Sequence, residues 1–463
     1  MSATVGKLAS SQRNGGIFYG WVIVAVCILC KMFKIQGQNN VMSYTVPHLL
    51  EDFNLSHSEL GGLFSVATMS AGLVQPSLGR AMDRFGARVC IPALQLGIAF
   101  TLLGFGAWRR PSDKLVLYLQ IICIFFFLRM LSIGAGETFP NAAVQQWFRR
   151  KRGRAVGVVF TFQWLGNGLI GLAVSAVVRR YSWHAAAFAG SGVNLMLAPL
   201  SALLLRRSPE VCGLLPDGVD DEEEVNLKAA SPEETSKEDA ARAPSFEVRK
   251  LWPHLLFSFF YAVMYGGSDF YMVEMVAEAS GNAKEILVSW HIFWPFALTN
   301  ALAVPSVGEL MDKVQSKRLP MLLLAIAALL TAVATVGLTC VTSRSNAVLY
   351  GVVRGFSSGI FQSLLTAGLA FAAAGVPREE IGRVLGFNQL TTVVGTGVGP
   401  CFYGFCRDLF GAFQGALLLT ALPPLALSLY FGCQARKAIP PADADAGEQA
   451  GLEPEVFGLE SEA

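Results

Sequence analysis

Residues 79–88 read GRAMDRFGAR, and residues 308–317 read GELMDKVQSK, 229 positions further along the chain. Each stretch places several charges between two apolar runs, in a sequence that is 53% hydrophobic and only 15% charged. Because charge is costly inside a bilayer, such clusters fit the short loops between membrane-spanning helices. The recurrence of the cluster indicates that one structural unit occurs twice.

Apolar stretches near the roughly 20 residues that a helix needs to cross a bilayer recur along the whole chain. The sequence therefore predicts an all-α integral membrane protein with twelve transmembrane helices in two six-helix bundles. The predicted spans are residues 18–46, 58–79, 89–107, 116–141, 154–178, 185–205, 252–276, 286–307, 319–341, 346–373, 383–405 and 411–433.

Composition changes abruptly between spans six and seven, where DDEEE and SPEETSKED supply charge and large apolar residues are scarce. Such a segment cannot bury a core of its own. The first apolar run is too long for a removable signal peptide and lacks a small-residue cleavage site, so we expect it to stay as a span. The predicted parts are a cytoplasmic N-terminal tail at 1–17, a bundle at 18–205, an acidic cytoplasmic linker at 206–251, a second bundle at 252–433 and an acidic cytoplasmic tail at 434–463.

The placement of Lys and Arg predicts the orientation of the chain. With twelve spans and the N-terminus inside, the short inner segments hold 17 of these residues and the outer loops hold 8. By the positive-inside rule this excess places both termini in the cytoplasm, with the spans in the plasma membrane or an organelle membrane. A net charge of +2, spread among loops and not gathered on one face, argues against a nucleic-acid partner.

Other matches support the duplication. RMLSIG at 129–134 pairs with RGFSSG at 354–359, and GRAVG at 153–157 pairs with GRVLG at 382–386. The order is the same in both halves, at an offset of 225 to 229 residues. Because each half contains an even number of spans, the copies are parallel repeats about an axis along the membrane normal, and we expect a cavity on that axis.

These stretches resemble a known family. GRAMDRFGAR resembles the loop two to three signature of the major facilitator superfamily, and RMLSIGAGE is similar to its helix-four Arg motif. FYGWVIV at 18–24, YSWH at 181–184 and GLLPDG at 213–218 are most similar to the oxalate/formate and monocarboxylate transporter branch. The resemblance implies a carrier of small organic anions. Oxalate carriers use basic residues in helices eight and eleven, where this chain offers only His291, Asn388 and Gln389, and that departure argues against a dicarboxylate.

The loop signature also implies a gate. A carboxylate at Asp83 is placed to meet the cytoplasmic N-terminus of helix eleven near Gly382, an interaction worth about 0.3 to 1 kcal/mol, which suffices to bias an alternating-access equilibrium. The alternative is that Asp83 and Arg84 only fix topology. The residues assigned to gating are Gly79, Asp83, Arg84, Gly86, Arg88, Gly308, Asp312, Lys313 and Arg354.

Ionisable groups at membrane depth indicate the substrate site, because each costs at least about 2.5 kcal/mol to place there. Lys31, Lys34 and Gln38 follow the spacing i, i+3, i+7, which predicts one helical stripe facing the cavity. Two cations there favour an anion, and Arg129 supplies bidentate contact to a carboxylate. The predicted substrate-binding residues are Lys31, Lys34, Gln38, Arg129, His291, Asn388 and Gln389.

Carboxylates at the same depth are predicted to couple transport to protons, since burial makes their protonation sensitive to which side the cavity faces. Asp269 is the first choice, Glu274 the second, and Glu137 a further candidate. The alternatives are internal ion pairs, such as Arg129 with Asp269. If Asp269 or Glu274 neutralises the lysines of helix one, a zwitterion such as an amino acid becomes the expected cargo.

Enzyme-like motifs are present without their required context. GNGLIG at 166–171 and GFSSG at 355–359 lie inside apolar spans and follow no predicted strand, so we expect no enzyme activity. No nucleotide-binding G-x-x-x-x-G-K-[ST] motif occurs, and the nine cysteines lack metal-ligand spacing, so no cofactor or metal is expected. The predicted function is secondary active transport of a small, monocarboxylate-like anion, driven by a gradient and performed by a monomer. The alternatives are a transporter-fold ligand sensor and a carrier of amino acids or other small solutes.

Overall fold

The computed structural model describes most of the two predicted bundles. The described residues are 18–148, 151–212, 214–215, 251–280, 288–314, 316, 318–366, 368, 370–371, 376 and 378–437. The predicted N-terminal tail, most of the acidic linker and nearly all of the C-terminal tail lie outside them. The beginning of the predicted linker is described, and it packs against the first bundle: Cys212 and Leu214 are both buried in that bundle's apolar core.

The described residues of the first half form helices joined by short turns. Its first span is broken, and its fourth widens into a π-helical turn. In order, the elements are α2 Gly20–Phe33, η1 Ile35–Gly37, α3 Asn39–Met42, α4 Val46–Phe53, α5 His57–Phe85, α6 Ala87–Gly106, α7 Lys114–Arg129, η2 Met130–Ala135, α8 Gly136–Trp147, α9 Arg152–Arg180, α10 Trp183–Leu204 and η3 Glu210–Cys212.

The second half repeats this plan. Its first span is interrupted at Tyr271, and its fourth again carries a π-helical turn. The elements are α13 Trp252–Phe270, α14 Met272–Ser280, η6 Ser289–Phe293, α16 Trp294–Lys313, α17 Arg318–Gly337, η7 Leu338–Cys340, α18 Arg344–Phe361, η8 Gln362–Thr366, α20 Arg378–Phe410 and α21 Gln414–Lys437.

Each predicted span coincides with a helix or a broken helix. Six stretches of the described residues are long and apolar enough by themselves to cross a membrane: Ala87–Gly106, Lys114–Trp147, Arg154–Arg180, Trp183–Leu204, Arg318–Cys340 and Gln414–Lys437. The remaining spans are interrupted, as at α2, or carry more polar side chains, as in α5 and α20. Polar residues inside a span are tolerated where they face protein or a cavity.

The loop signature GRAMDRFGAR lies where α5 ends and α6 begins. Gly86 has φ +75°, a backbone conformation that residues with a Cβ rarely adopt. A Cβ at this position would also lie 2.9 Å from the Arg207 side chain. The glycine of the signature thus allows the tight turn between the two helices. At its other end, α5 begins with a capping box formed by Ser56 and Glu59.

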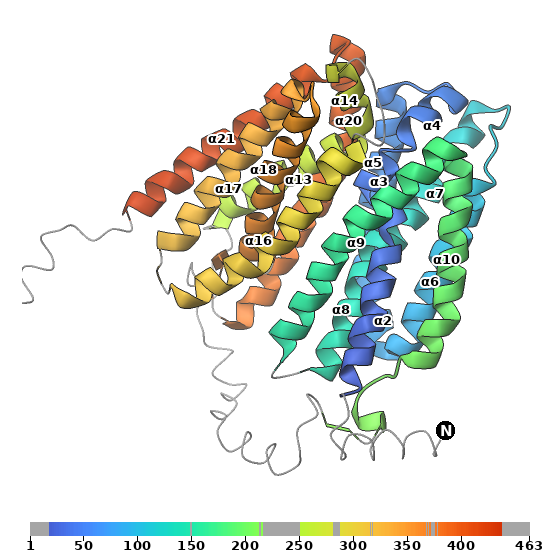
Figure 1. The fold of residues 1–463 in the computed structure, drawn as a ribbon, viewed down its shortest axis with the longest axis vertical. Coiled ribbons are helices and arrows are strands. Elements are labelled where there is room, and N and C mark those ends of the chain that lie inside the picture. Colours follow the sequence, from blue (N-terminus) through green and yellow to red (C-terminus); the bar gives the residue numbers. More distant parts are fainter. Residues whose placement is uncertain are drawn as a thin grey trace, which may run out of the picture.

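The two halves meet at one end of the molecule and separate toward the other. Figure 1 shows the helices converging near α14, α5 and α20 and diverging toward the end where the described chain begins. We call the convergent end the far end. There α20 packs against α5 of the other half, and α9 packs against α16.

Hydrogen bonds close the far end. The Ser58 backbone N–H donates to Asp408 Oδ2 across the halves at 2.8 Å, and the Tyr271 hydroxyl donates to the His57 carbonyl at 2.6 Å. His57 also lies within 3.6 Å of both Glu274 and Asp408. Backbones approach closely here, since a Cβ on Gly404 would lie 2.3 Å from the His57 carbonyl oxygen. This interface holds the protein in a state closed at the far end.

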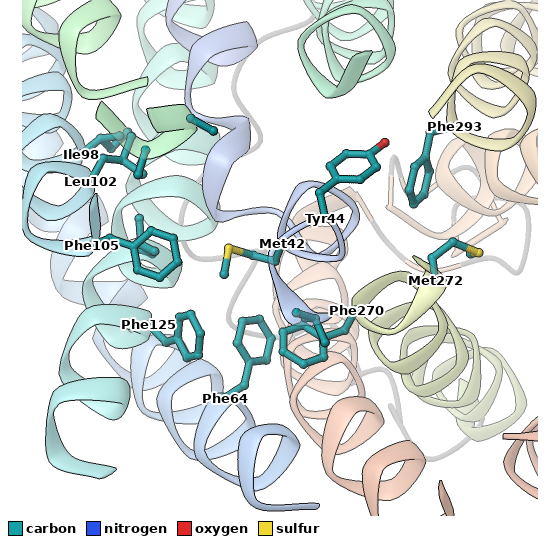
Figure 2. Packing of buried hydrophobic residues seen from close by; sticks show 14 of the residues in the cluster. Met42, Tyr44, Phe64, Ile98, Leu102, Phe105, Phe125, Phe270, Met272 and Phe293 are labelled. Atoms are coloured by element: carbon teal, nitrogen blue, oxygen red, sulfur yellow. The ribbon is translucent and has the colours of Figure 1, made fainter. Parts of the chain in front are cut away.

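Aromatic side chains fill the space between the halves below these bonds. The Phe64 ring of α5 lies 4.3 Å from the Phe270 ring of α13 and 5.1 Å from that of Phe125. Tyr44 and Phe293 form a second contact across the halves, with their ring centroids 6.1 Å apart. Figure 2 shows Met42 and Tyr44 of the broken segment among the rings of Phe64, Phe125, Phe270 and Phe293. They place the broken segment against both bundles.

Candidate functional site

A cavity of about 380 Å³ lies between the two halves and is lined by residues of both. Its lining is mostly amide, hydroxyl and aromatic side chains, with one arginine and one glutamate. The polar lining residues are Gln38, Asn39, Thr68, Gln75, Arg129, Glu137, Thr138, Asn141, Gln163, Asn167, Ser358, Gln362, Gln389, Thr392 and Thr396. The aromatic ones are Phe160, Trp164, Tyr261, Tyr265 and Phe361.

Arg129, at the end of α7, is the cation in the cavity lining. One of its guanidinium nitrogens donates to Asn39 Oδ1 at 2.6 Å and to the Gly37 carbonyl at 3.1 Å, and the group lies over the Phe64 ring. Among the described residues, no carboxylate lies within ion-pair distance of it. Arg129 therefore brings a positive charge to the cavity that its protein neighbours solvate but do not neutralise.

The two lysines of the first span share a single carboxylate. Lys31 Nζ lies 2.9 Å from Glu137 Oε2, and Lys34 pairs with the other oxygen of the same group. Gln163 accepts from Lys31 at 2.8 Å and donates to Glu137 at 2.8 Å. Both lysines are fully buried, whereas 30% of the Glu137 side chain is exposed. Glu137 thus lies between the lysines and the cavity.

Local backbone features position this cluster. Glu137 follows the π-helical turn η2, a distortion that is frequent at functional sites. A Cβ on Gly136 would lie 2.5 Å from the Lys34 side chain, so a larger residue there would displace the lysine. The sequence therefore accommodates the close approach of α2 to α8.

In the second half, Arg354 of α18 forms an ion pair with Asp269 of α13. Both side chains are at most 2% exposed, and the guanidinium lies over the rings of Tyr265 and Phe296. Neither member of the pair is in the cavity lining. Arg354, predicted in helix ten as a gating residue, thus lies in a helix of the second bundle in a buried ion pair, and its gating role stays a prediction.

The predicted stripe along the first span is wrong at its third member. α2 ends at Phe33, and Gln38 lies beyond η1 with extended backbone angles, φ −81° and ψ 148°. Gln38 does line the cavity, whereas Lys31 and Lys34 are behind Glu137. The alternative ion pairs are also absent from the described residues: Asp269 pairs with Arg354 and not with Arg129 or the lysines. Glu274 lies at the far end beside His57.

Of the substrate-binding residues predicted in helices eight and eleven, one lines the cavity and two do not. Gln389 lines the cavity, and His291 does not. Asn388 is buried, where it accepts from Ser258 at 2.5 Å and donates to the Leu365 carbonyl at 3.2 Å. Its amide is used for packing within the second bundle.

The predicted gate residues other than Arg354 lie toward the end opposite the far end, where the halves diverge (Figure 1). Asp83, Arg84 and Arg88 are exposed, and Lys313 forms an exposed 2.7 Å ion pair with Glu309. Within the described part of the chain, Asp83 makes no hydrogen bond or ion pair. The side chain of Asp312 and the surroundings of Gly382 are outside the described set. Gly79 and Gly308 face open space, because a Cβ on either would meet nothing within 4 Å.

Sequence reasoning included the cavity amides of Gln38 and Gln389 but missed the others. Gln163 and Asn167 lie one turn apart in α9, Asn39 follows the helix break, and Gln362 begins η8. Trp164 donates across the halves to Gln362 at 3.0 Å. These residues could have been found from the sequence as uncharged polar residues inside apolar spans. Such residues, like charged ones, need protein or water to solvate them.

Comparisons with known proteins agree with this architecture. Residues 27–367 match the sequence profile described as Major Facilitator Superfamily. A gallate transporter from Pseudomonas putida is 25% identical over 41% of this chain and 40% of its own length. Monocarboxylate transporter 11 from Homo sapiens is 27% identical over 42% of this chain and 39% of its own length. The chain thus matches about two fifths of the length of these relatives.

A solved structure shares the fold. The crystal structure of a bacterial homologue of the human lysosomal transporter Spinster superposes with a TM-score of 0.64 and covers 91% of this chain and 97% of that one. The two sequences are 13% identical, so the likeness concerns the fold alone. Together with the family match, it confirms the predicted fold class and the resemblance found in the sequence motifs.

Proposed function

Since the chain belongs to the major facilitator superfamily and is an integral membrane secondary transporter, we propose that its substrate is a small organic anion carrying one carboxylate. One observation carries the proposal. Three buried cations, Lys31, Lys34 and Arg129, surround the first-half side of the cavity, and the described residues oppose them with one carboxylate, Glu137. A low-dielectric site with excess positive charge strongly favours an anionic ligand.

The cavity lining suits such a ligand. Arg129 offers planar donors that match a carboxylate, which a lysine does not supply. The rings of Trp164, Tyr261 and Tyr265 offer apolar and edge contacts to the body of an organic acid, and nearby amides offer hydrogen bonds. The relatives described above are named for gallate and for monocarboxylates, and both names fit a carboxylated substrate.

Transport by alternating access fits the closed far end. The contacts from Ser58 and Tyr271 to the other half must break for the cavity to open there, while the diverging end must close. The excess of Lys and Arg in the predicted inner segments favours a far end that faces away from the cytoplasm. In this orientation the structure represents a state open to the cytoplasm, and the exposed Asp83 is free to act as a latch in the opposite state.

Glu137 is the carboxylate best placed to couple transport to protons. It lines the cavity, whereas Asp269 is enclosed with Arg354 and Glu274 lies at the far end. A substrate carboxylate that binds the lysines competes with Glu137 for them, and a displaced Glu137 gains a proton more readily because it loses its cationic partners. Proton and anion then move together, and no nucleotide is required.

Counterflow in proteoliposomes tests the proposed function. Vesicles containing purified protein are loaded with an unlabelled acid, either gallate, 4-hydroxybenzoate, lactate, pyruvate or glucuronate, and diluted into a trace of the same labelled compound. We expect transient accumulation of at least one acid above protein-free vesicles. The corresponding carboxamides should not accumulate, because they cannot neutralise the cations.

Two results would argue against this assignment. If the protein exchanges neutral sugars or amino acids but none of the organic acids tested, the result would favour the alternative function, a carrier of amino acids or other small solutes. Stabilisation of the protein by an acid that never exchanges would favour the ligand sensor.

A further inference from the structure

The internal duplication places two buried arginines in equivalent positions. Arg129 and Arg354 are 225 residues apart, each in the fourth span of its half, and each span continues into a π-helical turn. Each guanidinium lies over a phenylalanine of the second span: Phe64 at 5.1 Å for Arg129 and Phe296 at 5.2 Å for Arg354. The two halves therefore use the same arrangement of helices around an arginine.

The residues of the first span that contact the two arginines also occupy equivalent positions in the two halves. Gly37, Asn39 and Met42 precede Gly267, Asp269 and Met272 by 230 residues each, and both sets lie where the first span of the half is interrupted. Arg129 donates to the Asn39 side chain, and Arg354 pairs with the Asp269 side chain. The two sites differ chemically at this position, since one holds an amide and the other a carboxylate.

We infer that Asn39 is the residue that makes the cavity anion-selective, because an amide stands where the second half has the counter-ion of the arginine. The inference rests on the proposed function and names the residue responsible for charge selection. In the second half, Asp269 neutralises Arg354, and the pair is closed off from the cavity. In the first half, Asn39 orients Arg129 without neutralising it, and both residues line the cavity. The charge of Arg129 thus remains for the substrate.

The hydrogen bonds of Asn39 fix the orientation of its amide, with one end bound to Arg129 and the other end bound to the second half. Its Nδ2 donates to the Gly266 carbonyl of the other half at 2.9 Å, which leaves Oδ1 as the acceptor for Arg129. An aspartate at this position keeps the acceptor and loses the donor. Asn39→Asp therefore adds a counter-ion for Arg129 and removes one hydrogen bond between the halves, so the two effects need separate controls.

Binding of 4-hydroxybenzoate and 4-hydroxybenzamide to the purified full-length protein measures charge selection. The neutral variant Asn39→Ser also loses the bond to Gly266 and reports the cost of that bond. Asn39→Asp is expected to weaken 4-hydroxybenzoate binding at least about tenfold beyond Asn39→Ser, as the pairing of a desolvated charge is worth this much or more. Equal affinities of the two variants for 4-hydroxybenzoate would overturn the inference.

A double-mutant cycle on thermal stability tests the same point without a ligand. Unfolding midpoints are compared for wild type, Asn39→Asp, Arg129→Gln and the double variant. The loss of the Gly266 bond is common to both backgrounds and cancels. Asn39→Asp should be clearly less destabilising when Arg129 is present than when it is absent, because only then does the new carboxylate find a cation.

The outcomes separate the inference from the proposed function. Absence of coupling in the cycle would mean that Arg129 is already neutralised, and the inference would fail whatever the substrate. Coupling in the cycle, together with failure of wild type to bind or exchange any acid, would retain the charge assignment of Asn39 and refute the proposed anion transport.

Discussion

Replacing Asp269 with Asn is expected to destabilise the protein by about 3 to 5 kcal/mol, because the substitution leaves Arg354 buried without its counter-ion. The guanidinium is 2% exposed and lies among aromatic rings, so water cannot take over the role of the carboxylate. The thermal unfolding midpoint of the purified protein in detergent, followed by tryptophan fluorescence, should fall by about 3 to 5 °C.

The matched controls use neighbouring acidic and basic residues. Asp269→Asn combined with Arg354→Gln should recover part of the loss, since the double variant buries no net charge. Glu274→Gln, at the partly exposed pair with His57, should have a much smaller effect. If Asp269→Asn alone unfolds at the wild-type temperature, another group compensates the arginine and this assignment of the ion pair is wrong.

Replacing Glu137 with Gln is expected to have a comparable effect for the same reason, because it also leaves buried cations without a counter-ion. It removes the carboxylate that both Lys31 and Lys34 contact, while Gln163 remains as a neutral acceptor for Lys31. Two fully buried ammonium groups are then left unpaired, at a cost of about 3 to 5 kcal/mol. The unfolding midpoint should fall at both neutral and mildly acidic pH.

Removing one cation provides the control for Glu137. The double variant Glu137→Gln with Lys34→Met should be more stable than Glu137→Gln alone, because methionine keeps the length of the side chain and removes a charge. A double variant that is less stable than the single one would show that Lys34 is stabilised by something other than Glu137.

The spans, the duplication and the loop signature were predictable because they depend on local sequence. The length of an apolar run fixes whether a helix crosses the bilayer, and repeated motifs such as those at 129–134 and 354–359 are visible without a structure. The break after Phe33 coincides with the polar run KIQGQNN at 34–40, which the predicted span 18–46 nevertheless included. A close approach of Gly37 to Ser132, where a Cβ would lie 2.3 Å from the hydroxyl oxygen, accompanies the break.

The pairing of charges depends on which helices lie side by side, and this is why the sequence suggested the wrong partners. Asp269 was considered as a partner for Arg129 and for the lysines, yet α13 places it beside Arg354. Lys34 was expected in the cavity, yet the approach of α8 to α2 places Glu137 in front of it. The repeat itself contained a usable signal, as the offset that relates Met42 to Met272 also relates Asn39 to Asp269.

The central claim is that the cavity binds an organic anion through the unneutralised charge of Arg129. Isothermal titration calorimetry of the purified wild-type protein with 4-hydroxybenzoate and 4-hydroxybenzamide tests this claim most directly, with Arg129→Gln as the comparison. The account predicts that wild type binds the acid at least about tenfold more tightly than the amide, and that Arg129→Gln loses this preference. Equal binding of acid and amide by wild type, or an undiminished preference for the acid in Arg129→Gln, would contradict it.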